Sequence, residues 1–298
     1  IAQAACETED GPLSTFDLDE GEWYELRVAS WMHDCGKLAT PDSVLDKATK
    51  LHLMQDGIET VKTRFAAAMA QVELQFLRQT QAQPAQLNAL QDVLAAELAA
   101  LKDDCLFIEK ANVGGEFMKP EDQAHVRRIA GRKWVDHLGM ERPMLSEEEV
   151  KFLCIERGTL SFDERQKIND HMKVTVQMLE SLPFPKNLKR VPEYAGGHHE
   201  KMDGTGFPRG LKREEMSWPA RMMAIADVFE ALTASDRPYK QPMKISQALG
   251  ILQNMKRQNH IDPDLFDLFV MSRVWEKYAR IYLRPEQLDI TDAATYLQ

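Results

Sequence analysis

Apolar residues recur at steps of three and four along almost the whole chain, and no stretch alternates β-branched with polar residues. This spacing is typical of amphipathic helices, so the sequence predicts an all-α fold. Signals for helix starts, such as serine or proline before an acidic or apolar run, support this prediction. They mark helices over 17–38, 145–153, 160–182, 217–235 (with Pro219 in its first turn) and 261–283.

From about residue 52 to residue 111 the composition shifts to long runs of Ala, Gln, Leu and Glu, interrupted around Pro84. This pattern predicts an antiparallel helical hairpin with its turn near that proline, followed by a further helix near 120–138. Stripes of Ala and Leu pack equally well between copies and within one chain. The hairpin is therefore expected either to form a homodimer or docking contact, or to act as a buttress or lid within the chain.

The chain of 298 residues carries a formal net charge of −10 and has a pI near 5.4. A general binder of duplex nucleic acid would need a basic surface, so this function class is excluded, whereas a small anionic substrate is not. The four cysteines form no CxxC pair, which favours a reducing compartment. No apolar run approaches the ~20 residues of a membrane span, so the sequence predicts a cytoplasmic chain.

Residues with metal-ligand chemistry occur at several separate positions. His33 and Asp34 end the helix over 17–38, and Lys37 follows them in position to hold a phosphate. Asp227 lies among apolar residues in the helix over 217–235, where a buried carboxylate needs a cation or hydrogen-bond donors. His171 shares an apolar helical face, and an isolated histidine there is usually a hydrogen-bonded core residue.

The segment HHEKMDGTGFP at 198–208 places two histidines next to each other. Adjacent helical residues point about 100° apart, so both can bind one metal only if the helix ends there. The glycines that follow supply this freedom. Asp203 is expected to accept a hydrogen bond from one of the histidines, which would orient its ring. The remaining histidines, His52, His125, His137 and His260, are interpreted as structural or exposed.

Four segments, HDCGKLATPDSVLDKATKL, FDERQKINDH, HHEKMDGTGFPRGL and ARMMAIADVFEALTASDRPYK, resemble the HD-GYP phosphodiesterases of the HD phosphohydrolase superfamily. The resemblance covers about residues 20–51 and 158–270. It implies an all-helical domain that hydrolyses cyclic di-GMP or a related cyclic dinucleotide, with two or three divalent cations, usually iron or manganese. It divides the chain into residues 1–51, an unusually long insertion of residues 52–157, and residues 158–298.

Carried onto matching positions, the resemblance makes His33 and Asp227 ligands of one metal, with Asp34 bridging to a second. The second metal would take His171, His198 and His199. The resemblance also makes Lys37, Arg237 and Lys240 contacts of the substrate phosphate. With Asp203 added, the predicted substrate-binding residues are Lys37, Asp203, Arg237 and Lys240. The family signature Gly-Tyr-Pro stands here as Gly206, Phe207 and Pro208.

One departure concerns a further histidine ligand that the family carries upstream of the HD pair, because no histidine precedes His33 here. That ligand is expected to lie before the first residue of this sequence, together with an upstream sensory domain. Two alternative functions remain open. One is a receptor that binds a cyclic dinucleotide without cleaving it, and the other is a different nucleotide phosphohydrolase of the HD superfamily.

Overall fold

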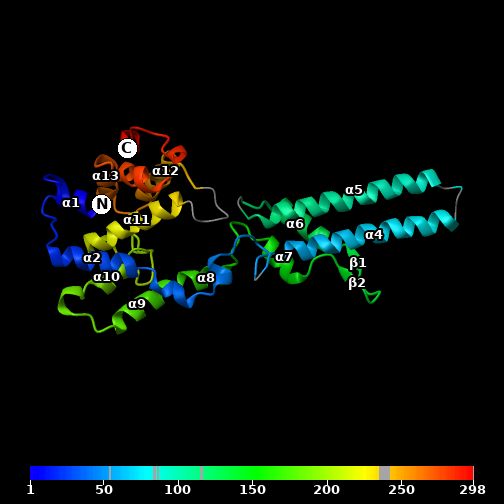
Figure 1. Cartoon of the computed structure of the whole chain (residues 1–298), viewed down its shortest axis with the longest axis horizontal. Helices are drawn as coiled ribbons and strands as arrows, with labels where there is room; N and C mark the ends of the chain where they lie inside the picture. The colour runs from blue at the N-terminus through cyan, green and yellow to red at the C-terminus, as the bar shows by residue number, and fades with distance from the viewer. Residues whose placement is uncertain (54, 83–84, 86, 115–116, 235–241, 298) are drawn as a thin grey trace. The chain divides into compact units, whose positions relative to one another are not determined.

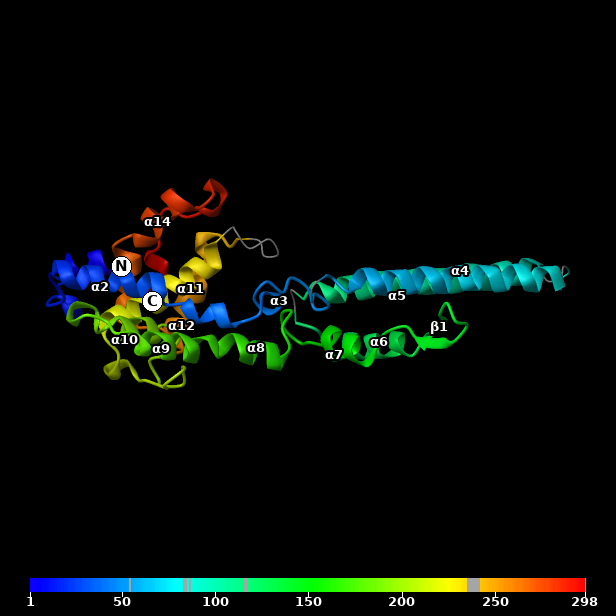
Figure 2. The ribbon, with the colours of Figure 1, turned by 60° about the horizontal axis from the view of Figure 1, so that its bottom comes forward.

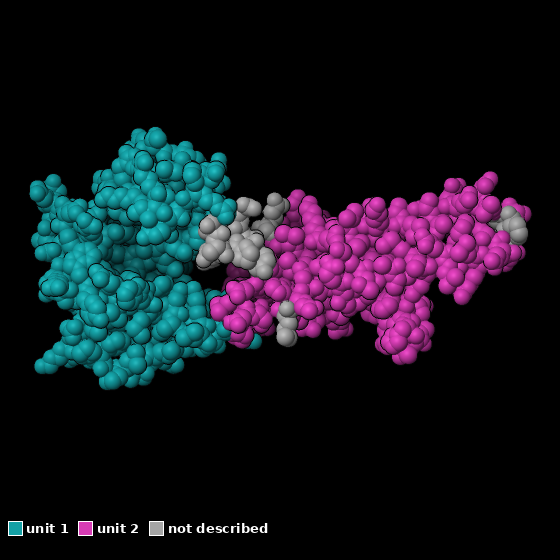
Figure 3. Space-filling model, in the orientation of Figure 1, with its two compact units in different colours: residues 1–40, 167–298 teal, residues 41–166 magenta. Residues whose placement is uncertain are grey.

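The computed structural model describes residues 1–53, 55–82, 85, 87–114, 117–234 and 242–297. The chain forms two compact units, residues 1–40 with 167–298 and residues 41–166, which Figure 3 distinguishes by colour. Helices make up nearly all of the regular structure, so the predicted all-α fold is confirmed. The division at residues 51 and 157 stays a prediction about domains.

The first unit contains all six residues predicted to bind metal. Its helices are α1 (Ala2–Cys6), α2 (Glu20–Met32), α9 (His171–Ser181), α10 (Val191–Gly196), α11 (Trp218–Thr233), α12 (Ile245–Arg257), α13 (Pro263–Met271) and α14 (Val274–Tyr282). Short 3-10 turns lie between them, including η2 (Cys35–Ala39) and η5 (Arg213–Glu215). Helix α8 (Phe162–Asn169) crosses the boundary between the two units.

Local capping explains where several of these helices begin. Asp19 accepts a hydrogen bond from Glu22 N while the Glu22 side chain accepts from Asp19 N, which closes a capping box at the start of α2. Ser217 caps α11, and Pro219 lies in its first turn, as predicted. Both helices therefore start at a defined residue, which fixes the position of each side chain along the helix axis.

Helix α11 lies between two apolar clusters of the first unit. On one side, Ile225 and Phe229 pack with α12, α13 and α14 around Phe266 and Trp275. On the other side, Met223 joins a cluster from α2, α9 and α10. Figures 1 and 2 show these helices gathered around α11. A helix held on both faces is a rigid support for a functional side chain.

Two of the predicted helices are each broken into two. The helix predicted over 160–182 stops at Asn169, and α9 begins at His171. The helix predicted over 261–283 is interrupted at Arg273, whose φ of 56° is left-handed. Neither break has a glycine or proline at the interruption, so the local sequence gives no signal for it.

The second unit is built on a helical hairpin of α4 (Ile58–Ala82) and α5 (Leu87–Asn112), which lie side by side in Figures 1 and 2. The predicted hairpin is confirmed, while its turn at Pro84 falls outside the described residues. Its base packs on α6 (Pro120–Ala130) and α7 (Glu147–Leu153) around Phe65 and Ile108. The unit also contains α3 (Asp42–Leu45).

The helix predicted near 120–138 ends earlier than expected. It stops at Ala130, and the following residues form an antiparallel pair of strands, β1 (Lys133–Val135) and β2 (Glu141–Pro143). The turn between the strands contains Gly139, whose φ of 78° favours glycine. Backbone pairing between the two strands therefore replaces the last two turns of the predicted helix.

Among the described residues, no helix combines the length and the apolar character that crossing a bilayer requires. The cytoplasmic location stays a prediction.

Candidate metal centre

The HD pair lies at the carboxyl end of α2. His33 follows the last helical residue, and its Nδ1 lies 2.7 Å from the carbonyl oxygen of Ser30. The carbonyls of a last helical turn lack partners within the helix, so Nδ1–H can donate to this one. The other ring nitrogen, Nε2, then carries a lone pair. It lies 3.2 Å from Asp34 Oδ2 and 3.7 Å from Oδ1 of Asp227 on α11.

Two further histidines repeat this arrangement at other helix ends. Nδ1 of His198 lies 2.7 Å from the carbonyl of Ala195 at the end of α10, and Nδ1 of His171 contacts the carbonyl of Ile168 at the end of α8. Their Nε2 atoms lie 3.9 Å and 3.1 Å from Asp34 Oδ1. Helix ends thus select the tautomer that leaves three Nε2 atoms free to bind a cation beside Asp34.

The adjacent histidines face a common space because the helix ends before them, as the sequence predicted. Helix α10 stops at Gly196, so His198 and His199 are not held at the helical angle. Their ring centroids lie 4.5 Å apart, and the His199 ring lies 5.3 Å from that of His171. Both histidines therefore lie beside His171, the first residue of α9.

Two groups of donors have the composition of metal sites. The first is His171, His198 and His199, and the second is His33, Asp34 and His198; within each group the ligand atoms lie within 4.8 Å of one another. Imidazole with carboxylate suits iron, manganese or zinc. His198 belongs to both groups, which places the two groups side by side.

A cation would also satisfy buried atoms that otherwise have no hydrogen bond. Asp34 Oδ1, His171 Nε2 and His198 Nε2 are buried, and no described residue makes a well-formed hydrogen bond to any of them. An unsatisfied buried polar atom is costly, and three such atoms converging on one point are unusual. The side chains present therefore fit a metal centre.

The protonation of the cluster reflects its mixture of burial and charge. Burial by itself lowers the pKa of His33, but the carboxylates of Asp227 and Asp34 outweigh it and raise this pKa to about 10. A cation would therefore have to displace the Nε2 proton of His33 before it could bind there. Burial lowers the pKa of both His198 and His199 to about 4. These two imidazoles are therefore neutral at pH 7, the form that binds metal.

The carboxylates of the centre stay ionised. Burial opposes their charge, yet the side chains of His171, His33 and Lys37 close to Asp34 hold the pKa of this carboxyl far below its usual value. The pKa of Asp227 is also lowered, because the bond from His33 outweighs burial. Two negative charges beside the neutral imidazoles of His198 and His199 give the centre the charge balance that a divalent cation requires.

Lys37 is held at the edge of the centre. Its Nζ lies 2.6 Å from Asp34 Oδ2, and 41% of its side chain is exposed. Its helical turn, η2, is pressed against α9, where a Cβ on Gly36 would lie 2.1 Å from the carbonyl oxygen of His171. Only glycine allows this approach, which brings the HD pair and His171 together.

Asp203 makes no hydrogen bond to a histidine within the described residues, and its predicted contact with substrate stays a prediction. Its carboxylate accepts hydrogen bonds from the backbone N and the hydroxyl of Thr205, at 2.9 and 2.7 Å. Three of the histidines, His33, His171 and His198, are oriented by backbone carbonyls at helix ends instead. The other two predicted substrate contacts, Arg237 and Lys240, lie outside the described residues.

A residue that sequence reasoning missed is Glu200, which directly follows the histidine pair. Its side chain is 1% exposed and accepts hydrogen bonds from the backbone N–H groups of Arg209 and Leu211, at 2.7 and 3.0 Å. The available signal was its place in HHExxDG, where an acid follows two predicted ligands.

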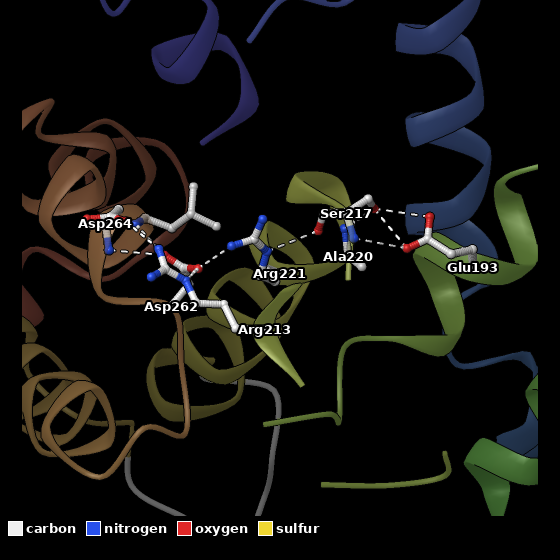
Figure 4. A network of polar contacts seen from close by, with 8 residues as sticks. Glu193, Arg213, Ser217, Ala220, Arg221, Asp262 and Asp264 are labelled. Atoms are coloured by element: carbon white, nitrogen blue, oxygen red, sulfur yellow. Dashed lines mark hydrogen bonds and ion pairs between the residues drawn. The ribbon is translucent and has the colours of Figure 1, made fainter. Parts of the chain in front are cut away.

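A polar network anchors the first turn of α11, the helix that carries Asp227 (Figure 4). Glu193 accepts a 2.9 Å hydrogen bond from the Ser217 hydroxyl, which ties α11 to α10. Arg221 donates to Asp262 at 2.5 Å, which ties α11 to the start of α13. The helix is thereby fixed at its amino end, with Asp227 held two to three turns further along.

Residues 148–265 match the family model of the HD domain. The matched part includes His171, His198, His199 and Asp227, whereas His33 and Asp34 lie before it, separated by the second unit.

Curated relatives agree with this match. A 3'3'-cGAMP-specific phosphodiesterase of Vibrio cholerae is 36% identical over 145 residues, which are 49% of this chain and 28% of that protein. A cyclic di-GMP phosphodiesterase of Pseudomonas aeruginosa is 47% identical over 74 residues, 24% of this chain and 17% of that protein. A cyclic di-GMP phosphodiesterase of Thermotoga maritima is 24% identical over 212 residues, 65% of this chain and 56% of that protein.

The shared segments thus span little more than half of the longest-matched relative and less of the others. Over these segments the chain is similar to HD-domain phosphodiesterases, and its motifs at 33–37 and 198–208 resemble those of the HD-GYP type.

Proposed function

We propose that this chain hydrolyses a phosphodiester bond of a cyclic dinucleotide, such as cyclic di-GMP or 3'3'-cGAMP. The observation that carries the proposal is the convergence of His33, Asp34, His171, His198 and His199 into two adjoining donor groups. The names of the similar proteins support this choice of substrate class.

The two donor groups would hold two divalent cations, with iron or manganese as the preferred metals. One cation would be bound by His33 and Asp227, and the other by His171, His198 and His199. Asp34 lies close to both groups of ligands. Bound there, the cations would activate water as a nucleophile and neutralise charge on the phosphate. Lys37 faces the same edge, where its exposed ammonium binds a phosphate oxygen of the substrate.

The acidic surface does not oppose an anionic substrate. The net charge of −10 belongs to the whole chain, whereas the field inside a pocket is set by its own cations and nearby basic groups. Arg237 and Lys240 are proposed to add positive charge at the substrate.

Hydrolysis of cyclic di-GMP and of 3'3'-cGAMP should be measured on the whole chain loaded with Fe²⁺ or Mn²⁺, with bound metal counted on the same sample. The expected product is the linear dinucleotide, which a second cut would convert to mononucleotides. Metal-loaded protein that binds a cyclic dinucleotide without cleaving it supports the receptor function instead. Turnover of a nucleoside triphosphate alone supports a different HD phosphohydrolase.

The outer part of the α4–α5 hairpin is proposed as a dimer contact. Within the described part of residues 69–100, no side chain is fully buried, and Leu74, Leu77 and Val93 are 47%, 55% and 60% exposed. The same range contains only four charged residues, Glu73, Arg78, Asp92 and Glu97, although 28% of the chain is charged. Two antiparallel hairpins would bury Leu74, Leu77 and Val93 in a four-helix bundle.

A further inference from the structure

His199 differs from the other three histidines of the centre in how its ring is held. The rings of His33, His171 and His198 each contact a backbone carbonyl through Nδ1. No residue in the described ranges makes a hydrogen bond to the ring of His199. Its orientation must therefore come from packing.

Besides the rings of His171 and His198, the His199 ring packs on Phe207. The centroids of the His199 and Phe207 rings lie 4.9 Å apart with an angle of 21° between the planes, so these rings are stacked. The backbone N–H of Phe207 also donates to the carbonyl oxygen of His199, at 3.2 Å. Phe207 is thus attached to the histidine by both its ring and its backbone.

Phe207 reaches this position because the loop from 200 to 211 closes on itself. A Cβ on Gly206 would lie 2.3 Å from the backbone N of Lys201, so the second half of the loop packs directly on the backbone of its first residues. Glu200 holds the closure through its bonds to the backbone N–H groups of Arg209 and Leu211. The carboxylate is 1% exposed, and no cation from a described side chain pairs with it.

We infer that Glu200 is a positioning residue for the metal centre: by closing the 200–211 loop it presses Phe207 onto His199 and sets the direction of that imidazole. This inference deepens the proposed function and rests on it for the identity of the centre. Partners that orient a metal-binding histidine typically change metal affinity by about 10- to 100-fold when they are removed. Loss of the Glu200 carboxylate should have an effect of this size on the group that contains His199.

The test uses Co²⁺, whose visible absorption reports ligand number and geometry. Titrations of the whole chain compare wild type with Glu200→Gln. The glutamine amide has one oxygen acceptor instead of two, so its NH₂ group faces one of the two backbone N–H groups that Glu200 accepts from. Glu25→Gln is the matched control, since Glu25 is 3% exposed and also accepts a backbone N–H, from Arg190, yet makes no contact with the loop. Glu200→Gln should weaken one Co²⁺ site about 10- to 100-fold and alter its spectrum, and Glu25→Gln should not.

A second pair of variants applies even if Glu200→Gln does not fold. Phe207→Leu removes the stacked ring and should weaken the same Co²⁺ site, whereas Phe207→Tyr keeps the ring and should bind as wild type does. Unchanged Co²⁺ affinity in a folded Glu200→Gln protein, or in Phe207→Leu, would overturn the inference. None of these measurements needs substrate. A chain with no turnover but with this pattern of Co²⁺ affinities would contradict the proposed function alone.

Discussion

The backbone N–H of Gly36 donates a hydrogen bond to the hydroxyl of Thr175, at 2.9 Å. This bond joins the turn after the HD pair to the second turn of α9, across 139 residues of sequence. Because His171 begins α9, the same contact sets the separation between Asp34 and His171. Their ligand atoms lie 3.1 Å apart. The second unit is inserted between two segments that must meet, and this contact brings them together.

Gly36→Ala should disrupt the centre and the fold around it. The new Cβ would lie 2.1 Å from His171 O and 2.6 Å from Thr175 N, and backbone atoms cannot move aside cheaply. We expect a loss of about 3 kcal/mol in the free energy of unfolding in urea, together with weaker metal binding. Gly250→Ala in α12 is the control, since its nearest atom is a Tyr296 ring carbon at 3.9 Å. A Gly36→Ala protein as stable as Gly250→Ala would contradict the prediction.

Asp34→Asn should abolish metal binding while preserving side-chain shape. Asp34 lies within reach of His33, His171 and His198, so its charge serves both donor groups. Elemental analysis after loading with Mn²⁺ should show the loss of both ions, or affinities lower by more than about 100-fold. Asp203→Asn is the matched control, because its oxygen can still accept from Thr205. Equal metal loss in both variants would restore the role first predicted for Asp203.

How far the sequence predicts this molecule depends on whether a signal is local. Helix α11 and the hairpin were predictable because apolar periodicity and caps lie within each element. The unwinding before His198 was also predictable, since two adjacent ligands on one helix cannot face one metal. The convergence of His33 with Asp227 was reached only through resemblance, because no local pattern pairs positions 194 residues apart.

The features that sequence reasoning missed depend on particular contacts that apolar periodicity does not report. The break before His171 is accompanied by the close approach of Gly36, and no local residue signals it. Strand β1 forms because a partner, β2, is available six residues later, although the local periodicity indicated helix. For Asp203, nearby Thr205 competes successfully for the carboxylate.

Asp262→Asn should strongly destabilise the first unit. Asp262 is fully buried, caps α13 through the backbone N–H of Asp264 and of Leu265, and accepts from Arg213 and Arg221. Removing one charge leaves two guanidinium groups without their shared partner, at a cost of about 3–5 kcal/mol by urea denaturation.

Asp267→Asn on the same helix is the control for this change. Asp267 pairs with Lys256 but is 32% exposed, so its loss should cost no more than about 1 kcal/mol. Similar costs for the two variants would mean that the Asp262 network contributes little to stability.

Tyr194→Phe should change how stability depends on pH. Burial raises the pKa of Tyr194 to about 12, although nearby Arg190 acts in the opposite direction. Since the phenol is more acidic in the unfolded chain, its contribution to stability is complete below about pH 10 and is lost as pH rises toward 12. Urea denaturation between pH 8 and 11 should show wild type losing stability relative to Tyr194→Phe above pH 10. Parallel curves would contradict the raised pKa.

The hairpin contact can be tested without touching the first unit. Leu74→Gln with Leu77→Gln replaces two side chains that are about half exposed in the single chain. Folding should be unaffected, but the mass measured by light scattering should fall from two chains to one, because the four-helix bundle loses its apolar contact. Leu138→Gln, at a 69% exposed position in the turn between β1 and β2, is the control and should leave the mass unchanged. If wild type has the mass of one chain, the hairpin is a buttress or lid and the dimer proposal is wrong.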